Sequence, residues 1–505
     1  MTERGMGMNC VIGIDTGTTH LKAALISADG CIQYLEKINT PLHVRGGQSW
    51  YDPQQIYETV KGQIRQLAAR AKDRKDLNIC GICLTGMAEA GLVLNRHTGC
   101  ELTEILPWFD KRPEELSKRP EEDLIRRQYR KTGLYNSYKY GIYKYIWLVE
   151  NRKLDKASSI WLSLSDYIAF RLTGKYVTTA GFAVRTYAYD MIRGSWDREL
   201  LERYGLKEEN FPSVVKEGET IGPCVDKELC GILNERPEAA IGGHDHICAL
   251  YAIAGEDCTR IVDSCGTAET YLGLVDKAPL TDADYDRGLV LGPYPGGTKW
   301  FFMGNIPSSG QSVEWFRKRR HDDRPQEPVL SYEEMEDLLK EIGDEPTGLF
   351  YFPFLSGVGT PVYRGDIREQ LHWNMKDVSA GVSLKALIEG IQYQGTWIME
   401  CAGSRLAEDE MQLWCVGGAA KSGEWMKIKA DILGIPVYVP GMEEAALIGA
   451  GAVFFYQRKE TALWAGTPVE SGKDVKIYLP ESGKQKIYRT LAEEYRSRAK
   501  QICGV

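Results

Sequence analysis

The sequence predicts an α/β protein built from two related halves, and three observations support this prediction. Predicted strands and helices alternate over several hundred residues. A strand, a turn rich in glycine and threonine, and a second strand occur in residues 11–26 and again in residues 261–274. The chain has 505 residues, which is too long for a single hydrophobic core. We therefore expect two domains, 1–255 and 256–505.

The first hairpin carries a single acid at the end of its leading strand. Val11–Ile14 is an apolar run that ends on Asp15. Gly17 follows in the turn, and its lack of a Cβ lets backbone N–H groups and hydroxyls approach a phosphate. Asp15 can hold the metal ion that accompanies such a phosphate. Because Gly266 and Thr267 repeat this turn in the second half, we expect a nucleotide between the two halves.

The elements that follow are indicated by capping residues and by apolar periodicity. Asp52 and Pro53 are typical of a helix start, and Ile56, Val60 and Ile64 form one apolar face behind them. Further expectations are a buried strand over 77–84, a tyrosine-rich loop and helix over 133–151, a long helix over 384–402 and a helix of small residues over 443–456.

Composition excludes several classes of function. The net charge of -8 argues against a nucleic-acid partner, and no apolar run approaches the ~18 residues that cross a bilayer. The first ten residues lack the apolar segment of a signal peptide. The 13 cysteines are scattered, and Cys80–Cys83 (CGIC) lies in a strand pattern, which favours a buried structural role. We expect a soluble cytoplasmic enzyme with no nucleic-acid or membrane partner.

The segment IGGHDHICAL, residues 241–250, offers three interpretations. His244 and His246 bracket Asp245 and are candidate metal ligands, although no further His or Cys ligand stands nearby. The segment is alternatively a structural turn. The preferred interpretation is that Asp245 is a general base at the end of a buried strand, where it accepts a proton from a sugar hydroxyl that attacks phosphorus.

The glycine loop GGAAKS, residues 417–422, is not a Walker A loop. That loop needs a glycine directly before its Lys-Ser pair, and Ala420 occupies the position. Phosphate binding is therefore expected from the two hairpins. The glycines at 417 and 418 are better suited to let adenine and ribose lie against the backbone.

These motifs, in their order along the chain, resemble those of the FGGY carbohydrate kinases within the actin-like ATPase superfamily. The motifs are IDTGTTHLKAAL, PWFDKR, GGHD, SCGTAET, FPFLSGVGTP, VGGAAKS and EEAALIGAG, and they run from about Val11 to about Tyr456. The resemblance implies two actin-like (ribonuclease H-like) domains with a nucleotide and substrate cleft between them. It also implies ATP and Mg²⁺ as cofactors and ATP-dependent phosphorylation of a hydroxyl.

The resemblance also implies a role for individual residues. Asp245 corresponds to the catalytic base, Asp15 to the magnesium-associated aspartate, and Lys22 to a basic residue near the transferred phosphate. The nucleotide-binding set that it implies is Asp15, Gly17, Thr18, Thr19, Lys22, Gly266, Thr267, Gln311, Gly417, Gly418 and Ala419. The substrate-binding set is Glu89, Trp108, Tyr138 and Asp245, with the register between Tyr138 and Tyr140 left open.

The identity of the substrate is where the chain departs from its relatives. Glycerol kinases carry an Arg-Glu pair and xylulokinases a Met-His pair where this chain has Ala88 and Glu89. Val358 replaces a charged residue that is common in its loop. We expect a small ketose, a pentulose foremost, or a polyol. The alternatives are a polyol kinase of the glycerol or erythritol type, an actin-like or chaperone-like ATPase that binds a protein, and a silent sensor. Relatives are often dimers or tetramers, and a homodimer is one expected assembly.

Overall fold

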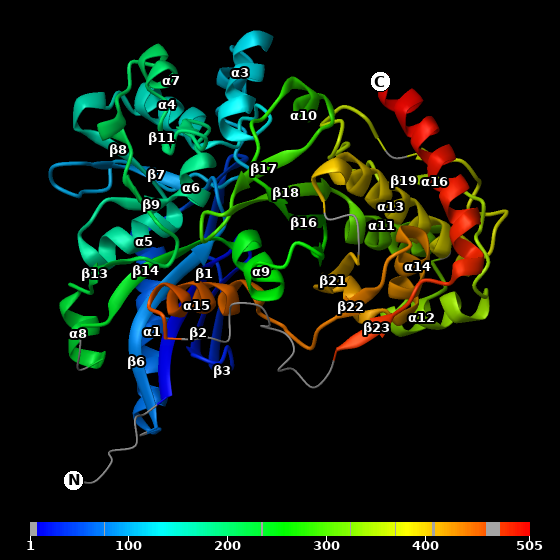
Figure 1. The fold of residues 1–505 in the computed structure, drawn as a ribbon, viewed down its shortest axis with the longest axis horizontal. Coiled ribbons are helices and arrows are strands. Elements are labelled where there is room, and N and C mark those ends of the chain that lie inside the picture. The colour runs from blue at the N-terminus through cyan, green and yellow to red at the C-terminus, as the bar shows by residue number, and fades with distance from the viewer. Residues whose placement is uncertain are drawn as a thin grey trace.

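The computed structural model describes residues 8–74, 76–233, 236–323, 325–368, 370–406, 410–460 and 475–505. Two twisted sheets lie side by side, each with helices against its faces (Figure 1). The first sheet has the order β13 (Thr220–Pro223), β14 (Glu238–His244), β6 (Leu77–Gly86), β1 (Met8–Thr16), β2 (His20–Ser27) and β3 (Ile32–Asn39). The second has the order β17 (Val290–Pro293), β18 (Lys299–Ile306), β16 (Glu269–Asp276), β15 (Arg260–Cys265), β21 (Gln412–Val416), β22 (Val437–Val439) and β23 (Lys476–Tyr478).

The two sheets share a five-strand pattern. In the first, β1 pairs antiparallel with β2 and β2 with β3, while β1 pairs parallel with β6 and β6 with β14. In the second, β15, β16 and β18 repeat the antiparallel run, and β15, β21 and β22 repeat the parallel one. The predicted repeat of two hairpins is therefore part of a larger repeat. The division at residues 255 and 256 stays a prediction.

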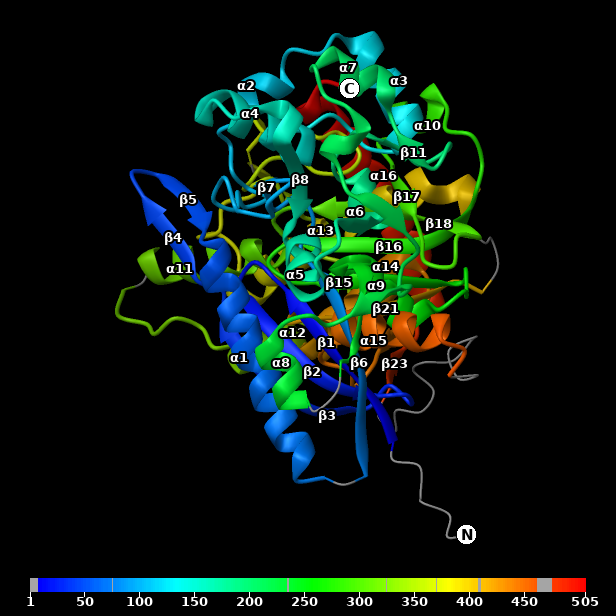
Figure 2. The same ribbon diagram turned by 90° about the vertical axis from the view of Figure 1, so that its left-hand side faces the viewer.

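Helix α1 (Pro53–Lys72) covers the first sheet and begins where the sequence predicts. The Asp52 side chain accepts the N–H of Gln55 at 2.8 Å, which satisfies one of the free donors of the first turn. Its apolar face is fully buried against the sheet. Figure 2 shows α1 running along this sheet, with the hairpin of β4 (Leu42–Arg45) and β5 (Gln48–Tyr51) projecting beside it.

Helices α9 (Asp245–Ala254) and α15 (Ala445–Gln457) join the two sheets. Helix α9 follows β14 of the first sheet and also packs on β15, whereas α15 follows β22 of the second sheet and packs on β1, β6 and β14. The two helices lie against each other (Figures 1 and 2). Their contact depends on small residues, because a Cβ at Gly449 would lie 1.8 Å from the carbonyl oxygen of Cys248.

The other helices of the second half pack together on the far side of its sheet (Figure 1). They are α11 (Ser309–Asp323), α12 (Tyr332–Glu341), α13 (Ala380–Ala402), α14 (Gly423–Leu433) and α16 (Ser482–Cys503). The long helix predicted from Leu384 begins four residues earlier, at Ala380, because Ser379 caps it through the N–H of Val382.

The first half carries additional elements above its sheet (Figure 1). They are β7 (Gly91–Asn95), α2 (Glu114–Ser117), α3 (Glu122–Thr132), α4 (Gly141–Arg152), β8 (Ser159–Ser163), α5 (Leu164–Thr173), β9 (Val177–Thr179), α6 (Ala180–Val184), β10 (Tyr189–Asp190), β11 (Ser195–Trp196), α7 (Arg198–Arg203) and β12 (Ser213–Val215). Helix α8 (Lys227–Leu233) packs against α1 instead. The short elements of the second half are α10 (Asp282–Asp286), β19 (Tyr351–Phe352) and β20 (Gln370–Leu371). The tyrosine-rich segment forms a loop followed by α4, as predicted.

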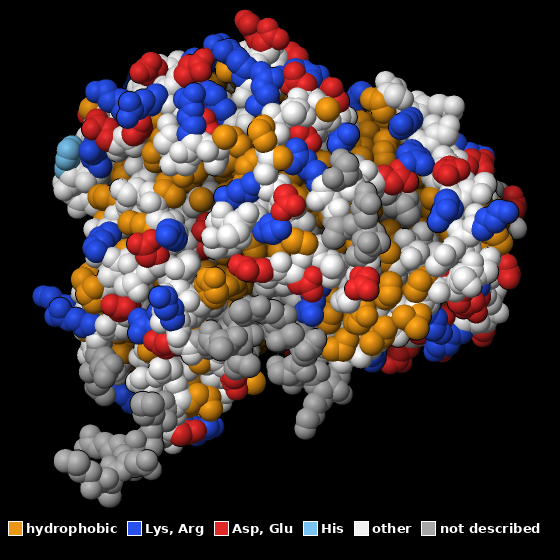
Figure 3. Space-filling view, viewed as in Figure 1, with side chains coloured by type: hydrophobic (Ala, Val, Ile, Leu, Met, Phe, Trp, Pro, Cys, Tyr) orange, Lys and Arg blue, Asp and Glu red, His pale blue; other side chains and the backbone are white. Residues whose placement is uncertain are grey.

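The surface charges, the helices and the cysteines can be compared with the expectations from the composition. Basic and acidic side chains are interspersed over the face shown in Figure 3. Among the described residues, no helix combines the length and apolar character that a membrane span requires. All 13 cysteines have free thiols, and Cys80 and Cys83 lie within β6, which confirms their predicted place in a strand.

Candidate active site

Three parallel strands of the first sheet end at the same edge. Their register aligns Thr16 of β1 with Gly86 of β6, and Gly86 with His244 of β14. Asp15 therefore lies near the end of its strand, and Asp245, which follows β14 directly, begins α9 at the same edge. The two carboxylates are close enough for the charge of Asp245 to raise the pKa of Asp15.

Asp15 is a buried carboxylate with one oxygen that the protein does not satisfy. Its side chain faces Lys22, whose Nζ lies 3.9 Å from Asp15 Oδ2 and 2.6 Å from Glu444 Oε2. Oδ1 is buried and has no hydrogen-bond partner among the described residues. Burial first, and Asp245 second, raise the pKa of Asp15 well above its usual range. A buried, unsatisfied carboxylate oxygen beside a second acid fits a divalent cation.

Asp245 is held as an ionised carboxylate by its two neighbours. His244 Nε2 lies 3.0 Å from Asp245 Oδ1, and the backbone N–H of His246 donates to the same oxygen at 2.7 Å. Burial alone favours the neutral acid, but His244 and His246 hold the pKa of Asp245 below its usual range. The ligand atoms of these three residues lie within 4.8 Å of one another, which is also the spacing of a metal site, so the metal interpretation of this segment stays a prediction beside that of a general base.

The first glycine turn is connected to an aromatic wall. Trp108 Nε1 donates to Thr18 Oγ1 at 2.9 Å, and Thr40 Oγ1 donates to the carbonyl of Gly17 at 2.7 Å. A Cβ at Gly17 would lie 2.8 Å from the carbonyl of His20, so the tight turn requires glycine. The backbone N–H of Thr40 also donates to the carbonyl of Thr19 at 2.9 Å. The structure thus places the predicted phosphate turn and the predicted substrate tryptophan in direct contact.

The predicted nucleotide-binding segments of the second half also meet one another. The N–H of Gly310 donates to the carbonyl of Gly266 at 3.1 Å, and that of Gln311 to the carbonyl of Thr267 at 3.0 Å. Gly417 has φ of +105°, and a Cβ there would lie 2.6 Å from the carbonyl of Cys265. The ends of β15 and β21 and the start of α11 therefore form one site. Gly418 and Ala419 follow directly in the turn after β21.

Glu89 is paired with an arginine that sequence reasoning missed. Arg185 follows α6 and donates from Nε to Glu89 Oε1 at 2.6 Å, with a second contact from its terminal nitrogen. Glu89 is buried and has φ of +63°, an uncommon backbone conformation for a residue with a side chain. The two residues are 96 positions apart, and no local pattern in the sequence connects them.

The tyrosine-rich loop places a lysine against Trp108. Lys139 Nζ lies 5.1 Å from the centroid of the Trp108 ring, and Lys144 Nζ donates to the carbonyl of Trp108 at 3.4 Å. Tyr138 is half-buried, whereas Tyr140 is buried and stacks on Tyr187. Sequence reasoning missed both lysines. Asp110 and Arg112 of the PWFDKR motif pair with each other through four hydrogen bonds.

A buried ionic cluster lies beneath the second glycine turn, and sequence reasoning missed it. Lys429 of α14 contacts Asp263 and lies 3.0 Å from Glu269 Oε1, and all three side chains are fully buried. Ser309 Oγ at the start of α11 donates to Glu269 Oε2 at 2.6 Å, and Tyr271 donates to Oε1 at 2.7 Å. The cluster therefore connects the hairpin β15–β16 to the helix that braces the turn.

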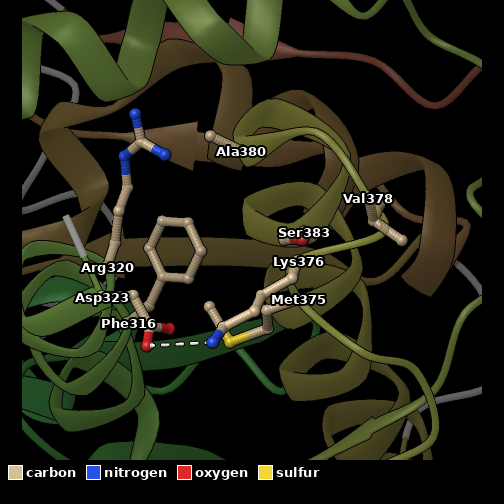
Figure 4. A pocket seen from close by; sticks show the side chains of 8 residues that line it. All are labelled: Phe316, Arg320, Asp323, Met375, Lys376, Val378, Ala380 and Ser383. Carbon is tan, nitrogen blue, oxygen red and sulfur yellow. Dashed lines mark ion pairs between the residues drawn. The ribbon is translucent and has the colours of Figure 1, made fainter.

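Two pockets in the described part of the chain lie elsewhere. One, of about 40 Å³, opens between α11, the loop at 375–378 and the start of α13 (Figure 4). Its size suits one or two water molecules. The other, of about 320 Å³, lies between α13, α14 and α16. Neither is lined by a residue of the predicted site.

Known proteins match the chain along most of its length. Residues 10–252 match the N-terminal domain of the FGGY family of carbohydrate kinases, and residues 262–457 match its C-terminal domain. A glycerol kinase from Solidesulfovibrio magneticus is 26% identical over 476 residues, which cover 90% of this chain and 93% of that protein.

Solved structures share the fold. A gluconate kinase from Lactobacillus acidophilus superposes with a TM-score of 0.87 and 20% identity over 98% of this chain and 99% of its own. A ligand-bound xylulose kinase from the same organism superposes with a TM-score of 0.86 and is 21% identical, over 98% of each chain. A Plasmodium falciparum glycerol kinase with ADP superposes with a TM-score of 0.84 and is 20% identical, over 98% of this chain and 99% of its own. These likenesses confirm the predicted fold of two actin-like domains. With both family domains matched in order, the chain belongs to the FGGY family of carbohydrate kinases, phosphotransferases whose acceptor is an alcohol group.

Proposed function

We propose that this chain transfers the γ-phosphoryl group of ATP to a hydroxyl of a small sugar or polyol, with Asp245 as the general base. The observation that carries the proposal is the pair of carboxylates at one sheet edge. His244 and His246 hold the pKa of Asp245 below its usual range, whereas burial and Asp245 raise the pKa of Asp15, which a divalent cation bound there would lower again. Two acids whose surroundings separate their pKa values are typical of a site that divides two roles between them.

Asp245 is suited to take the proton. Both of its internal contacts are made to Oδ1. We assign Oδ2 as the atom that receives the proton of the attacking hydroxyl. Because the attack on phosphorus involves little covalent chemistry by the protein, alignment of this hydroxyl is the main contribution of the base.

We assign the binding of the ATP phosphates to Asp15, Lys22 and the two glycine turns. Asp15 Oδ1 is the oxygen that would hold Mg²⁺, and the bound ion would neutralise charge on the phosphates. Lys22 adds positive charge next to Asp15. The backbone of Gly17, Thr18 and Thr19 and that of Gly266 and Thr267 would receive the phosphate oxygens. We place the adenosine at Gly417, Gly418 and Ala419, and Gln311 beside it.

Glu89, Trp108 and Tyr138 are assigned to the acceptor. The Glu89 carboxylate accepts hydrogen bonds from hydroxyls, and the Trp108 indole covers the C–H face of a sugar. The hydrogen bond from Trp108 to Thr18 supports this assignment, because it joins the acceptor wall to the phosphate turn. The acceptor class that we propose from the sequence is a ketose, a pentulose foremost, or a polyol. We also keep the domain division at residues 255 and 256 and the homodimer as proposals.

The test is a panel of tetruloses, pentuloses, hexuloses and polyols with Mg-ATP. ADP release is coupled to an optical readout, and mass spectrometry detects the phosphate monoester of any acceptor. We expect one class of acceptor to give both products with the wild type and neither with Asp245→Asn. ATP hydrolysis that a protein stimulates and that no acceptor changes would instead favour a protein-binding ATPase.

A further inference from the structure

Lys22 and Asp15 are neighbours across the first hairpin. The antiparallel register of β1 and β2 places them directly opposite each other, on the same face of the sheet. Opposite charges at such positions normally pair. The ammonium of Lys22 nevertheless lies 3.9 Å from Asp15 Oδ2, too far for a hydrogen bond, and 2.6 Å from Glu444 Oε2. Glu444 is therefore the principal partner of Lys22.

Glu444 reaches this hairpin from the second half of the chain. It directly precedes α15, which packs on β1 and β2. Its side chain makes no capping hydrogen bond to the first turn of α15, so its carboxylate is left to Lys22. Only 22% of the Lys22 side chain and 13% of the Glu444 side chain are exposed. Because solvent and salt screen such a pair weakly, it holds its geometry better than a surface ion pair.

Lys22 stays charged in this position. Burial alone lowers the pKa of Lys22, but the hydrogen bond to Glu444 and the charge of Asp15 raise it above its usual value. An ammonium has three N–H donors, and the bond to Glu444 uses one of them. The other two are left for the oxygens of a phosphate while Glu444 keeps the ammonium in place.

Asp15 would lose its affinity for a cation if Lys22 moved onto it. The buried Oδ1 of Asp15 has no hydrogen-bond partner among the described residues and is the oxygen proposed to hold Mg²⁺. A close ion pair between Lys22 and Asp15 would place a positive charge beside that oxygen, and this charge would repel the ion. The bond to Glu444 prevents this, because it draws the ammonium away from the Asp15 carboxylate.

We infer that Glu444 is a positioning residue that holds Lys22 off Asp15 and so keeps the Asp15 carboxylate open for a divalent cation. This role depends on the proposed function, in which Asp15 binds Mg²⁺, and Glu444 itself makes no bond to the ion. Without the Glu444 carboxylate, Lys22 would turn to Asp15 Oδ2 and compete with the ion.

The experiment measures the Kd of the protein for Mn²⁺, a paramagnetic substitute for Mg²⁺, by electron paramagnetic resonance, with and without a non-hydrolysable ATP analogue. Glu444→Gln keeps the shape of the side chain and removes its charge. We expect this variant to raise the Kd roughly 10- to 100-fold, the usual effect of losing a partner outside the ligand shell. Adding Lys22→Met to Glu444→Gln should restore nearly the wild-type Kd, because no ammonium then remains to occupy Asp15. The control is Glu443→Gln, which removes the charge of the exposed neighbouring residue and should leave the Kd unchanged.

A crystal structure of Glu444→Gln without metal separates a movement of Lys22 from a simple change in net charge. We expect Lys22 Nζ at hydrogen-bond distance from Asp15 Oδ2, about 3 Å. A raised Kd with Nζ still away from Asp15 would overturn the inference, and so would a raised Kd that Lys22→Met does not reverse. An unchanged Kd in Glu444→Gln would overturn it as well.

Phosphoryl transfer, measured on the same variants, distinguishes the failure of this inference from the failure of the proposed function. If the expected Mn²⁺ affinities are found in a protein that phosphorylates no acceptor, the role of Glu444 stands and only the proposed function fails. An active kinase whose metal dependence is the same in Glu444→Gln overturns the inference and keeps the function. A wild type that binds no Mn²⁺, with or without the ATP analogue, also overturns the inference.

Discussion

Replacing Lys429 by methionine tests whether the buried ionic cluster holds the second glycine turn in place. The side chain of Lys429 is fully buried between Asp263 and Glu269, which are fully buried as well. Lys429→Met keeps the length of the side chain and removes its charge. Two carboxylates then remain in the interior without a cation, next to the serine hydroxyl that anchors α11.

The expected loss of stability follows from the burial of all three groups. Removing one partner of a buried ion pair costs about 3–5 kcal/mol, because the remaining charge stays buried. In a folding unit of 150–250 residues each kcal/mol lowers Tm by about 2–4 °C, so we expect a decrease of about 6–20 °C. Burial and Glu269 already raise the pKa of Asp263, so proton uptake will relieve part of the cost at low pH. A carboxyl group whose pKa is raised by folding stabilises the folded state less as the pH rises. The stability lost by Lys429→Met is therefore larger at pH 8 than at pH 5.

The assay combines thermal and chemical denaturation with steady-state kinetics. Glu269 holds Ser309, and the two residues that follow brace Gly266 and Thr267, so KM for ATP should rise more than KM for the acceptor. The matched control is Lys427→Met on the same helix, which removes a solvent-exposed ammonium paired with Glu424 and should cost less than about 1 kcal/mol.

A double-mutant cycle shows whether the cost comes from the unpaired charge. Asp263→Asn in the Lys429→Met background should recover part of the lost stability, because it removes one of the two uncompensated carboxylates. A Lys429→Met variant within about 1 kcal/mol of the wild type, or simple additivity of the two substitutions, would show that the ionic cluster does not hold the turn.

Three further predictions concern other parts of the molecule. Glu89→Ala should raise the acceptor KM roughly tenfold or more, equivalent to about 1.4 kcal/mol, and the ATP KM much less; equal effects on both in steady-state kinetics would contradict a role in acceptor binding. Gly449→Ala should cost about 1–3 kcal/mol in urea denaturation, because its Cβ would overlap the carbonyl of Cys248; an equally stable variant would argue against close contact of α9 and α15. Burial lowers the pKa of Lys144 from 10.5 to about 7, so between these two pH values the unfolded chain binds more protons than the folded chain. The unfolding free energy should therefore rise with pH from about 7 to 10.5, and this rise should be absent from denaturation curves of Lys144→Met; parallel profiles would contradict it.

Local sequence patterns were sufficient to predict many elements of the fold. The cap at Asp52, the strand through Cys80–Cys83 and the helix before Ala402 all follow from periodicity and capping, which act over a few residues. The strand–turn–strand repeat was predictable for the same reason. Its extension to five strands was not, because β22 is only three residues long and its pairing with β21 depends on contacts distant in sequence.

The candidate site likewise contains residues that local motifs predict and residues that only the folded structure shows. Asp15, Gly17, Gly266 and Asp245 belong to short motifs, and the structure brings the two acids to one edge. Arg185 belongs to no motif, and its role is defined by Glu89, which lies 96 positions away. For Lys139, only the folded loop shows that its side chain, between two tyrosines in the sequence, lies over Trp108.

Likewise, Lys429 is one of two lysines in α14, and its burial follows from the packing of this helix against the second sheet. Long-range pairing of charges is a property of the tertiary structure, and a single sequence does not contain it in a local form.

The central claim is that Asp245 removes the proton from the acceptor hydroxyl, and the most direct measurement compares Asp245→Asn with the wild type. Substrate-dependent ADP formation and the affinity for ATP are measured on the same preparations. We predict that turnover falls by roughly 100-fold or more, the usual effect of removing a general base, while ATP binds with nearly unchanged affinity. Undiminished turnover with the same ATP affinity would contradict the claim and remove Asp245 from the mechanism.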